Sequence, residues 1–326
     1  MITYTYDRGW GSEWPLKQME TTIVNQYTQS WIKDSVSTAV INSTWFQGSD
    51  IDEIHQSLKS HSVERVILVS MLDAPIAQPE MFASWPTAAV GYYSTPHEID
   101  FWALFVHQYL TVDFDTTRSD LIDTAFMCLN RKPHWHRKRL YRELETKQLL
   151  DHGIVSMGST AGAAQRQADS TDTVNSLAPN GGAEQHGIVN DIASLGDPLL
   201  WQRHFLNVVT ETIFETGSKR FVSEKIYKPI VGQRPFLVYS DDGAVAWLQE
   251  HGFEPYVNDF ADITDLNLAD PNNISDFLVT LAQQSTQYLQ SKFVALKPKL
   301  VYNKHNFSQY VSSIQSKINQ GITCQI

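Results

Sequence analysis

Short apolar runs alternate with helix-like segments along the first third of the chain. Four of these runs, rich in β-branched and aromatic side chains, predict strands at residues 2–6, 37–45, 65–70 and 88–93. Residues 49–58 carry apolar side chains at helical spacing behind a Ser or Asp cap, and residues 99–110 predict an aromatic-rich helix. Strands that alternate with helices indicate a parallel sheet in an α/β domain.

A second series of the same kind fills the rest of the chain. Strands are expected at residues 125–129, 154–157, 205–209, 235–239 and 254–257. Helices are expected at residues 137–150, around 224, at 244–250 and over much of the chain from 273 to 318. Residues 158–191 are rich in small and polar side chains, which predicts a long surface insertion, either a tolerated excursion or a lid over a site.

The two series predict two α/β domains. We expect an N-terminal acceptor-side domain over residues 1–115, and a C-terminal nucleotide-sugar-binding domain with a flexible insertion over residues 116–326. Both are predicted to be Rossmann-like and to face each other across a cleft, with a helical C-terminal tail. The cleft is the default ligand site.

Composition narrows the classes of partner. The 25 basic and 36 acidic residues give a net charge of −11, which argues against general binding of nucleic acid. The two cysteines, Cys128 and Cys324, make no disulfide framework, and no apolar run approaches the ~20 residues that span a bilayer. The first residues lack the pattern of a signal peptide, so a cytoplasmic protein is the expectation.

Residues 205–240 carry the most informative pattern. Glu211 and Thr212 follow a predicted strand, and Ser223, Glu224 and Lys225 open the next predicted helix. In a strand–loop–helix–strand unit, ligands gather where strands end and helices begin. An acid at the first boundary and an acid–lysine pair at the second suit a sugar that bears a diphosphate.

Each of these residues also has a purely structural interpretation. Glu224 falls in the first helical turn behind a Ser223 cap, where the helix dipole stabilises an acid without any ligand. Lys225 in the same turn is less expected, because cations prefer the other end, and an anionic ligand would explain it. Glu211 suits sugar hydroxyls or a developing positive charge on a sugar ring, but an ordinary loop or capping acid fits equally well.

A basic run at residues 130–139 follows the predicted strand 125–129. It includes Arg131 and Arg137, and Arg137 lies near the start of the next helix. A diphosphate is bound by guanidinium groups and helix N-terminal amides, so this segment is a candidate phosphate site with Arg137 as the best-placed donor. The structural alternative is a solvated basic turn that pairs with nearby acids.

Metal-binding patterns are weak by comparison. Asp113 and Asp115 form the Asp-x-Asp pattern of metal-dependent sugar transferases, but three residues are a short pattern in an acidic chain. His134 and His136 have no third ligand nearby in sequence. No metal site is therefore expected.

The second half of the chain resembles the α1,3-fucosyltransferase family and its bacterial and phage relatives, which have the GT-B fold. The resemblance covers about residues 123–255. It rests on the segment from Phe221 to Lys225, on a strand that opens with Pro235, and on the spacing of Arg137 and Leu144. The chain departs from the family at Phe221, where the family has tyrosine, at Thr212, where it has asparagine, and in a longer interval between Glu211 and Glu224.

The resemblance implies an inverting, metal-independent transferase whose C-terminal domain holds the nucleotide sugar. By position, Arg137 and Lys225 would contact the diphosphate, Glu224 the ribose and Phe221 the nucleotide. Glu211 would lie near the sugar.

The sequence therefore predicts a glycosyltransferase that moves a sugar from a nucleoside-diphosphate donor to an unknown glycan or other hydroxyl acceptor, and the resemblance implies a fucosyltransferase-like reaction. The donor is a substrate, and no cofactor is expected. Asp73, after the strand 65–70, is the candidate general base, with Glu98 as another. The alternatives are a non-catalytic nucleotide-sugar or glycan-binding protein on a degenerate transferase fold, and a metal-dependent transferase that uses Asp113 and Asp115.

Overall fold

The computed structural model describes residues 2–5, 38–42, 56, 65–70, 90–94, 100–110, 112, 114–130, 133–157, 195, 197–212, 214, 222–240 and 243–320. The predicted insertion at 158–191 lies outside the described residues. The chain divides into two compact units, one made of residues 1–105 and 311–326 and the other of residues 106–310.

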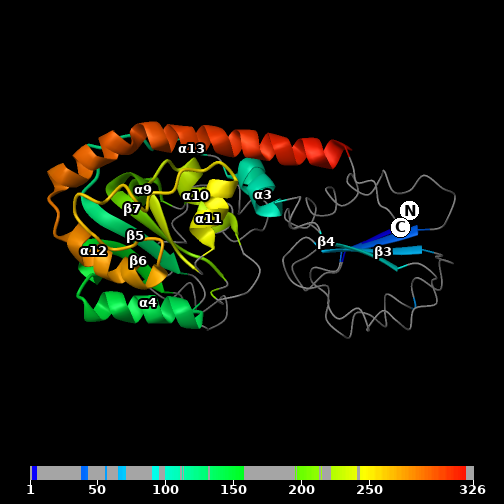
Figure 1. Cartoon of the computed structure of the whole chain (residues 1–326), viewed down its shortest axis with the longest axis horizontal. Coiled ribbons are helices and arrows are strands. Elements are labelled where there is room, and N and C mark those ends of the chain that lie inside the picture. Colours follow the sequence, from blue (N-terminus) through cyan, green and yellow to red (C-terminus); the bar gives the residue numbers. More distant parts are fainter. Residues whose placement is uncertain are drawn as a thin grey trace. The chain divides into compact units, whose positions relative to one another are not determined.

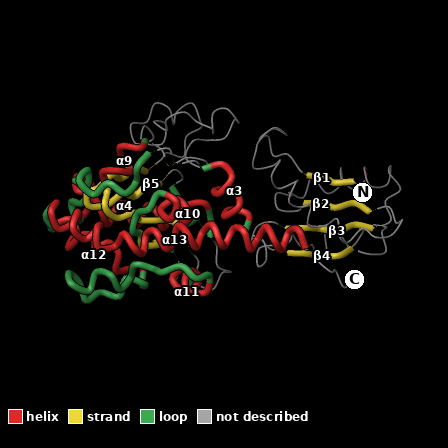
Figure 2. Tube along the Cα trace, turned by 90° about the horizontal axis from the view of Figure 1, so that it is seen from above, coloured by secondary structure: helices red, strands yellow, loops and turns green. Residues whose placement is uncertain are grey.

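The first unit contains a parallel sheet, drawn as yellow strands in Figure 2. Its strands are β1 (Ile2–Thr5), β2 (Thr38–Asn42), β3 (Arg65–Ser70) and β4 (Val90–Ser94), in the spatial order β1-β2-β3-β4. All four predicted strands are confirmed, and the predicted helix at residues 99–110 is α3 (Phe101–Tyr109). Of the helix predicted at residues 49–58, only Gln56 is described, and it is helical.

The second unit is built on a second parallel sheet. Its strands are β5 (Thr124–Asn130), β6 (Gly153–Met157), β7 (His204–Thr210) and β8 (Phe236–Tyr239). Their spatial order is β6-β5-β7-β8, so the chain first moves from β5 to one side and then returns to the other. All seven residues of β7 are buried, as expected of a central strand with both faces covered.

Helices cover both faces of this sheet. Figure 1 shows α4 (Trp135–Thr146) and α12 (Ile274–Ala282) on one side, and α10 (Glu224–Val231) with the long α13 (Thr286–Gln320) on the other. Tyr227 of α10 packs against Phe307 of α13 with ring centroids 5.1 Å apart. The helix after β5 and the helix after β7 therefore lie on opposite faces, and the strand order reverses between β5 and β7.

The long helix α13 buries one apolar face. Its buried apolar side chains lie three, four or seven residues apart and form one stripe: Leu289, Phe293, Leu296, Leu300, Phe307, Val311 and Ile314. Full burial of each such side chain stabilises the fold by roughly 1.5–3 kcal/mol. The helical tail predicted from residue 273 is confirmed as α12 and α13, which follow the short helix η6 (Pro271–Asn273).

Local expectations around the second sheet are mostly confirmed. Strands β5 to β8 and the helix α11 (Ala244–Glu250) lie where they were predicted. Two short helices were not predicted, η4 (Leu150–His152) and α9 (Pro198–Arg203). The side chain of Asp197 caps α9 by accepting from the main-chain N–H of Leu199.

The strand predicted at residues 254–257 is wrong, because these residues form no strand in the structure. Pro255 has no N–H to donate to a neighbouring strand. The N–H of Glu254 instead donates to Asn303 Oδ1 of α13 at 2.8 Å, and Asn303 Nδ2 donates to the carbonyl oxygen of Glu254 at 2.9 Å. A helix side chain thus takes the place of a strand partner.

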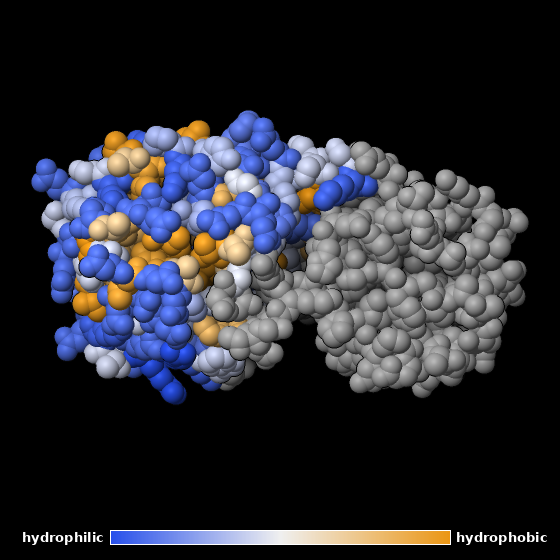
Figure 3. Space-filling model, in the orientation of Figure 1, coloured by the Kyte–Doolittle hydropathy of each residue, from blue (hydrophilic) through white to orange (hydrophobic). Residues whose placement is uncertain are grey.

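The surface of the described residues carries both hydrophilic and apolar side chains. The face of the second unit in Figure 3 is mainly hydrophilic, with apolar residues in a band across its middle. Among the described helices, none combines the length and the apolar content needed to cross a bilayer.

Candidate functional site

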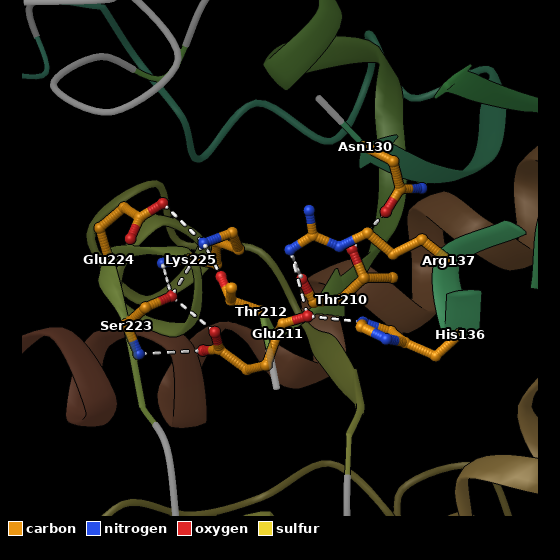
Figure 4. Close-up of polar contacts among 9 residues, drawn as sticks. All are labelled: Asn130, His136, Arg137, Thr210, Glu211, Thr212, Ser223, Glu224 and Lys225. Atoms are coloured by element: carbon orange, nitrogen blue, oxygen red, sulfur yellow. Dashed lines mark hydrogen bonds and ion pairs between the residues drawn. The ribbon is translucent and has the colours of Figure 1, made fainter. Parts of the chain in front are cut away.

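The candidate site lies at the carboxyl ends of β5 and β7, where the strand order reverses. At such a point the segments that follow the two strands turn to opposite faces of the sheet and leave a crevice in which α/β proteins bind ligands. The basic run follows β5, and the segment from Glu211 to Lys225 follows β7. Two segments that the sequence singled out separately therefore meet at one edge (Figure 4).

The ends of β5 and β7 are tied together by buried polar side chains. Thr210 Oγ1 donates to Asn130 Oδ1 at 2.5 Å, and Asn130 Nδ2 lies 3.4 Å from Cys128 Sγ. The main-chain N–H of Asn130 donates to Ser156 Oγ of β6 at 3.3 Å. Burial raises the pKa of the Cys128 thiol to about 11, so this thiol stays protonated. These contacts fix the relative positions of the strand ends.

Arg137 projects from the first turn of α4 toward the end of β7. Its Nη2 donates to the carbonyl oxygens of Thr210 at 2.9 Å and of Glu211 at 3.1 Å. The side chain is buried, with 3% of its surface exposed. The structure therefore brings Arg137 to the predicted edge, and at the same time shows that its guanidinium binds the main chain there.

His136 contacts the same point of the main chain. Its Nε2 lies 2.8 Å from the carbonyl oxygen of Glu211, and because a carbonyl only accepts, the proton must be on Nε2. Burial lowers the pKa of His136 to about 4, and the nearby Arg137 and His134 lower it as well, whereas the hydrogen bond to Glu211 opposes the shift. His136 is therefore neutral at pH 7, and its buried Nδ1 has no hydrogen-bond partner among the described residues.

The carboxylate of Glu211 turns away from Arg137 and toward α10. Its Oε1 accepts from the Ser223 N–H at 3.1 Å and its Oε2 accepts from Ser223 Oγ at 2.5 Å. Burial raises the pKa of Glu211, and Lys225 and Ser223 partly oppose this shift. Both carboxylate oxygens are thus occupied by the residue that caps α10.

Lys225 uses its ammonium group to join the two sides of the loop. Nζ donates to Thr212 Oγ1 at 3.2 Å, to Ser223 Oγ at 3.1 Å and to Glu224 Oε1 at 2.8 Å. Burial raises the pKa of Glu224, but the charges of Lys225 and Lys228 outweigh this effect and leave the pKa below its usual value. Glu224 is therefore ionised at neutral pH, next to a lysine that keeps 26% of its side-chain surface exposed.

The start of α10 confirms the predicted cap. Ser223 Oγ accepts from the main-chain N–H of Lys225 at 3.4 Å, and Glu224 lies in the first turn. Pro229 lies within this helix, which ends two residues later at Val231. Ile226, Tyr227 and Ile230 are buried and anchor this helix in the core.

Aromatic side chains line the α4 side of this edge. Phe214, which follows β7, stacks on His136 with centroids 5.2 Å apart and contacts Trp135 and Tyr239 at 5.4 and 4.9 Å. Trp135 has 57% of its surface exposed. Burial raises the pKa of Tyr239 to about 12, so its hydroxyl is neutral.

Several predicted site residues lie outside the described residues, namely Arg131, Phe221, Asp73, Glu98 and Asp113. Asp115 is described and lies near the amino end of β7, whereas the proposed site is at the carboxyl end. The carbonyl oxygen of Asp115 accepts from Gln202, which lies just before β7. Its Oδ1 accepts from the N–H and hydroxyl of Thr117. Within the described part of the chain, no group of three or more His, Cys, Asp and Glu side chains is placed to hold a metal ion.

The sequence did not single out Asn130, Thr210 or a non-metal role for His136. Their positions in the sequence could have identified them. Asn130 and Thr210 are the last residues of two adjacent strands, and His136 directly precedes Arg137. Polar residues that end buried strands are candidates for an edge network, because buried polar groups are almost always paired.

The arrangement brings cationic groups and carboxylates together at one edge, with Lys225 paired to Glu224 at 2.8 Å. It combines the N-terminus of α10, the guanidinium of Arg137 and the ammonium of Lys225, and such groups bind phosphate oxygens. Glu224 supplies an ionised acceptor beside them, as a hydroxyl-bearing ligand requires. No protein-family model, curated protein or solved structure matches this chain.

Proposed function

We propose that this protein is a glycosyltransferase that binds a nucleoside-diphosphate sugar at the carboxyl ends of β5 and β7. One observation carries the proposal: the basic turn after β5 and the Glu211–Lys225 segment after β7 meet where the strand order reverses. The sequence predicts phosphate and sugar chemistry for both segments, on opposite sides of one diphosphate site. The resemblance to the α1,3-fucosyltransferases favours a GT-B arrangement of two Rossmann-like domains.

The reaction we propose inverts the anomeric carbon and needs no metal ion. The bond between the sugar C1 and the diphosphate oxygen breaks while the acceptor oxygen attacks from the other face. Negative charge develops on the leaving diphosphate, and Arg137, Lys225 and the N-terminus of α10 stabilise it. The ionised Glu224 accepts hydrogen bonds from the ribose hydroxyls.

The acceptor side of the proposal comes from the first unit. A carboxylate there removes the proton of the acceptor hydroxyl as that oxygen attacks. Asp73 is the candidate, since it follows β3 by a few residues. The acceptor is a glycan or another molecule with a free hydroxyl.

The experiment that tests this function begins with a thermal-shift screen of GDP-, UDP-, ADP- and CMP-sugars. A ligand that binds only the folded state raises the melting temperature, by an amount equivalent to about 2.7 kcal/mol at one hundred times its Kd. The sugar nucleotide that stabilises the protein is then incubated with it, and hydrolysis is followed with and without EDTA. We expect slow hydrolysis that EDTA leaves unchanged. Loss of activity in EDTA would favour the metal-dependent alternative, and no stabilisation by any sugar nucleotide would contradict the proposal.

A second candidate function is binding of a nucleotide sugar without transfer. The observation that favours it is the burial of Arg137 and Glu211, whose polar groups contact the protein itself. In that case the sugar nucleotide would raise the melting temperature, but it would remain intact over many hours with the protein. Hydrolysis above the rate of a buffer blank separates the two functions.

A further inference from the structure

Glu211 is the residue at which the two sides of the candidate site meet. Its carbonyl oxygen accepts from His136 Nε2 at 2.8 Å and from Arg137 Nη2 at 3.1 Å, both on α4. Its carboxylate accepts from the N–H and the hydroxyl of Ser223, which caps α10. Figure 4 shows Glu211 between these two groups, with α4 side chains on one side and Ser223 on the other.

The contacts run on from Ser223 to the lysine. Ser223 Oγ accepts from both the main-chain N–H and the Nζ of Lys225. A chain of contacts therefore joins Arg137 to Lys225: Arg137 donates to the main-chain carbonyl of Glu211, whose carboxylate accepts from Ser223, which in turn accepts from Lys225. The two cations that we assign to one diphosphate are held relative to each other by this chain.

The carboxylate of Glu211 is poorly placed to contact a sugar. The residue has 1% of its surface exposed, and each oxygen already accepts a hydrogen bond from Ser223. Isolated carboxylates are costly to bury, so this one depends on the Ser223 donors and on nearby Lys225. These features are those of a structural acceptor, and a group that stabilises positive charge on a substrate would face the substrate.

We propose that Glu211 is a positioning residue, which holds Arg137 and the N-terminus of α10 at the separation that a diphosphate requires. This inference rests on the proposed function. In this role the side chain of Glu211 must be long enough to contact Ser223 from the end of β7. Its negative charge is not required to stabilise the sugar.

Two substitutions separate reach from charge. Glu211→Asp keeps the charge but is one methylene shorter and loses the contacts to Ser223. Glu211→Gln keeps the reach, and its amide still offers an oxygen to the Ser223 N–H. We expect Glu211→Asp to weaken the binding of a nucleoside diphosphate about tenfold, as loss of a buried hydrogen-bond pair does, and Glu211→Gln by at most about threefold.

Calorimetric titration with both the nucleoside diphosphate and its sugar nucleotide gives the discriminating result. A positioning residue acts on the diphosphate, so Glu211→Asp should weaken both ligands by the same factor. If Glu211 instead stabilises the sugar directly, Glu211→Gln should be the more damaging substitution and should weaken only the sugar nucleotide. That pattern would overturn the inference.

The matched controls are Glu143→Asp and Glu143→Gln. Glu143 lies on α4 and pairs with Arg139 at 3.0 Å, outside the chain of contacts. Neither control should change the affinity. If Glu211→Asp does not fold, Ser223→Ala tests the same linkage from its other end, and Ser223→Thr, which retains the hydroxyl, should restore the affinity. Loss of affinity in Ser223→Ala without recovery in Ser223→Thr would overturn the inference.

Hydrogen exchange in the absence of ligand distinguishes failure of the linkage from failure of the proposed function. The amides in the first turn of α10 should exchange faster in Glu211→Asp than in Glu211→Gln or in the wild type. If no nucleoside diphosphate binds the wild type but this difference is observed, the proposed ligand is wrong and the positioning role remains. Equal exchange in all three proteins would remove the positioning role, whatever the ligand.

Discussion

At the scale of single residues, the largest fully buried side chain among the described residues belongs to Arg234, two residues before β8. Its side chain is fully buried, and its guanidinium donates to main-chain carbonyl oxygens of Trp201 at 2.7 Å and of Thr116 at 2.6 Å. The guanidinium also lies 4.6 Å from the ring centroid of Phe293 in α13. Burial lowers the pKa of Arg234 to about 9, which still leaves it charged at pH 7. One residue thus joins α9, the chain before β5 and the long helix.

We expect Arg234→Lys to reduce the free energy of unfolding by about 3 kcal/mol, as other broken buried charge networks do. A single ammonium cannot reach carbonyl oxygens that a planar guanidinium spans in different directions. Urea denaturation measures the change. Arg118→Lys is the matched control, because Arg118 is exposed and pairs with Asp120 at the surface, and this control should be unchanged. A stable Arg234→Lys protein would contradict the role that we assign to the guanidinium geometry.

His136 gives the site a predictable dependence on pH. Its pKa falls from 6.5 to about 4 on folding, because burial disfavours the imidazolium. Between these values the unfolded chain binds more protons than the native protein, so the free energy of unfolding falls as the pH falls from 6.5 toward 4. At pH 5 this loss amounts to roughly 2 kcal/mol from His136.

His136→Gln should remove that part of the pH dependence, since the glutamine amide can donate to Glu211 without taking up a proton. Urea unfolding at pH 7, 6 and 5 tests the prediction. His305→Gln, on the exposed side of α13, is the control and should retain the wild-type slope. Identical slopes in wild type and His136→Gln would show that His136 is not buried in its neutral form.

At the scale of helices and strands, the sequence pattern predicted most elements because local periodicity reports burial. The strands β1 to β8 and the helices α11 to α13 follow from apolar runs and from the three-to-four-residue stripe in α13. The strand expected at residues 254–257 failed because Asn303, distant in sequence, takes the main-chain groups of Glu254. The short helix α9 was missed because six residues are too few to show a helical period.

The pairing of β5 with β6 depends on a glycine that no periodicity argument identifies as essential. Gly153 lies opposite Phe126 in the register, and a Cβ at position 153 would come within 2.5 Å of the Phe126 ring. Phe126 is fully buried, so the ring has no room to move aside.

Gly153→Ala should therefore reduce the free energy of unfolding by about 1–3 kcal/mol through overpacking. Phe126→Leu in the Gly153→Ala background should recover part of that loss, because it removes the ring edge that the new methyl group meets. A double-mutant cycle measured by denaturation gives the coupling, and strictly additive effects would refute the steric explanation.

At the scale of the whole molecule, the site exists only because the order of β5 and β7 brings two distant segments together. The sequence predicted Arg137, Glu211, Glu224 and Lys225 as candidates on opposite sides of one site, and the pairing of β5 with β7 places the two strand ends side by side. Their contacts could not be predicted, because nothing in the local pattern shows that Glu211 turns its carboxylate to Ser223 and its carbonyl oxygen to Arg137. The contacts of Glu211 depend on how segments distant in sequence pack together.

The most direct test of the account is the affinity for a nucleoside diphosphate, measured by calorimetry in four matched variants. Arg137→Ala and Lys225→Ala each remove a proposed phosphate contact. Arg203→Ala and Lys147→Ala remove cations of the same kind that pair with Asp123 and Asp276, outside the edge. We expect the first two variants to lose at least about tenfold in affinity and the two controls to stay within about twofold of the wild type. Unchanged affinity in both Arg137→Ala and Lys225→Ala would contradict the assignment of this edge as the diphosphate site.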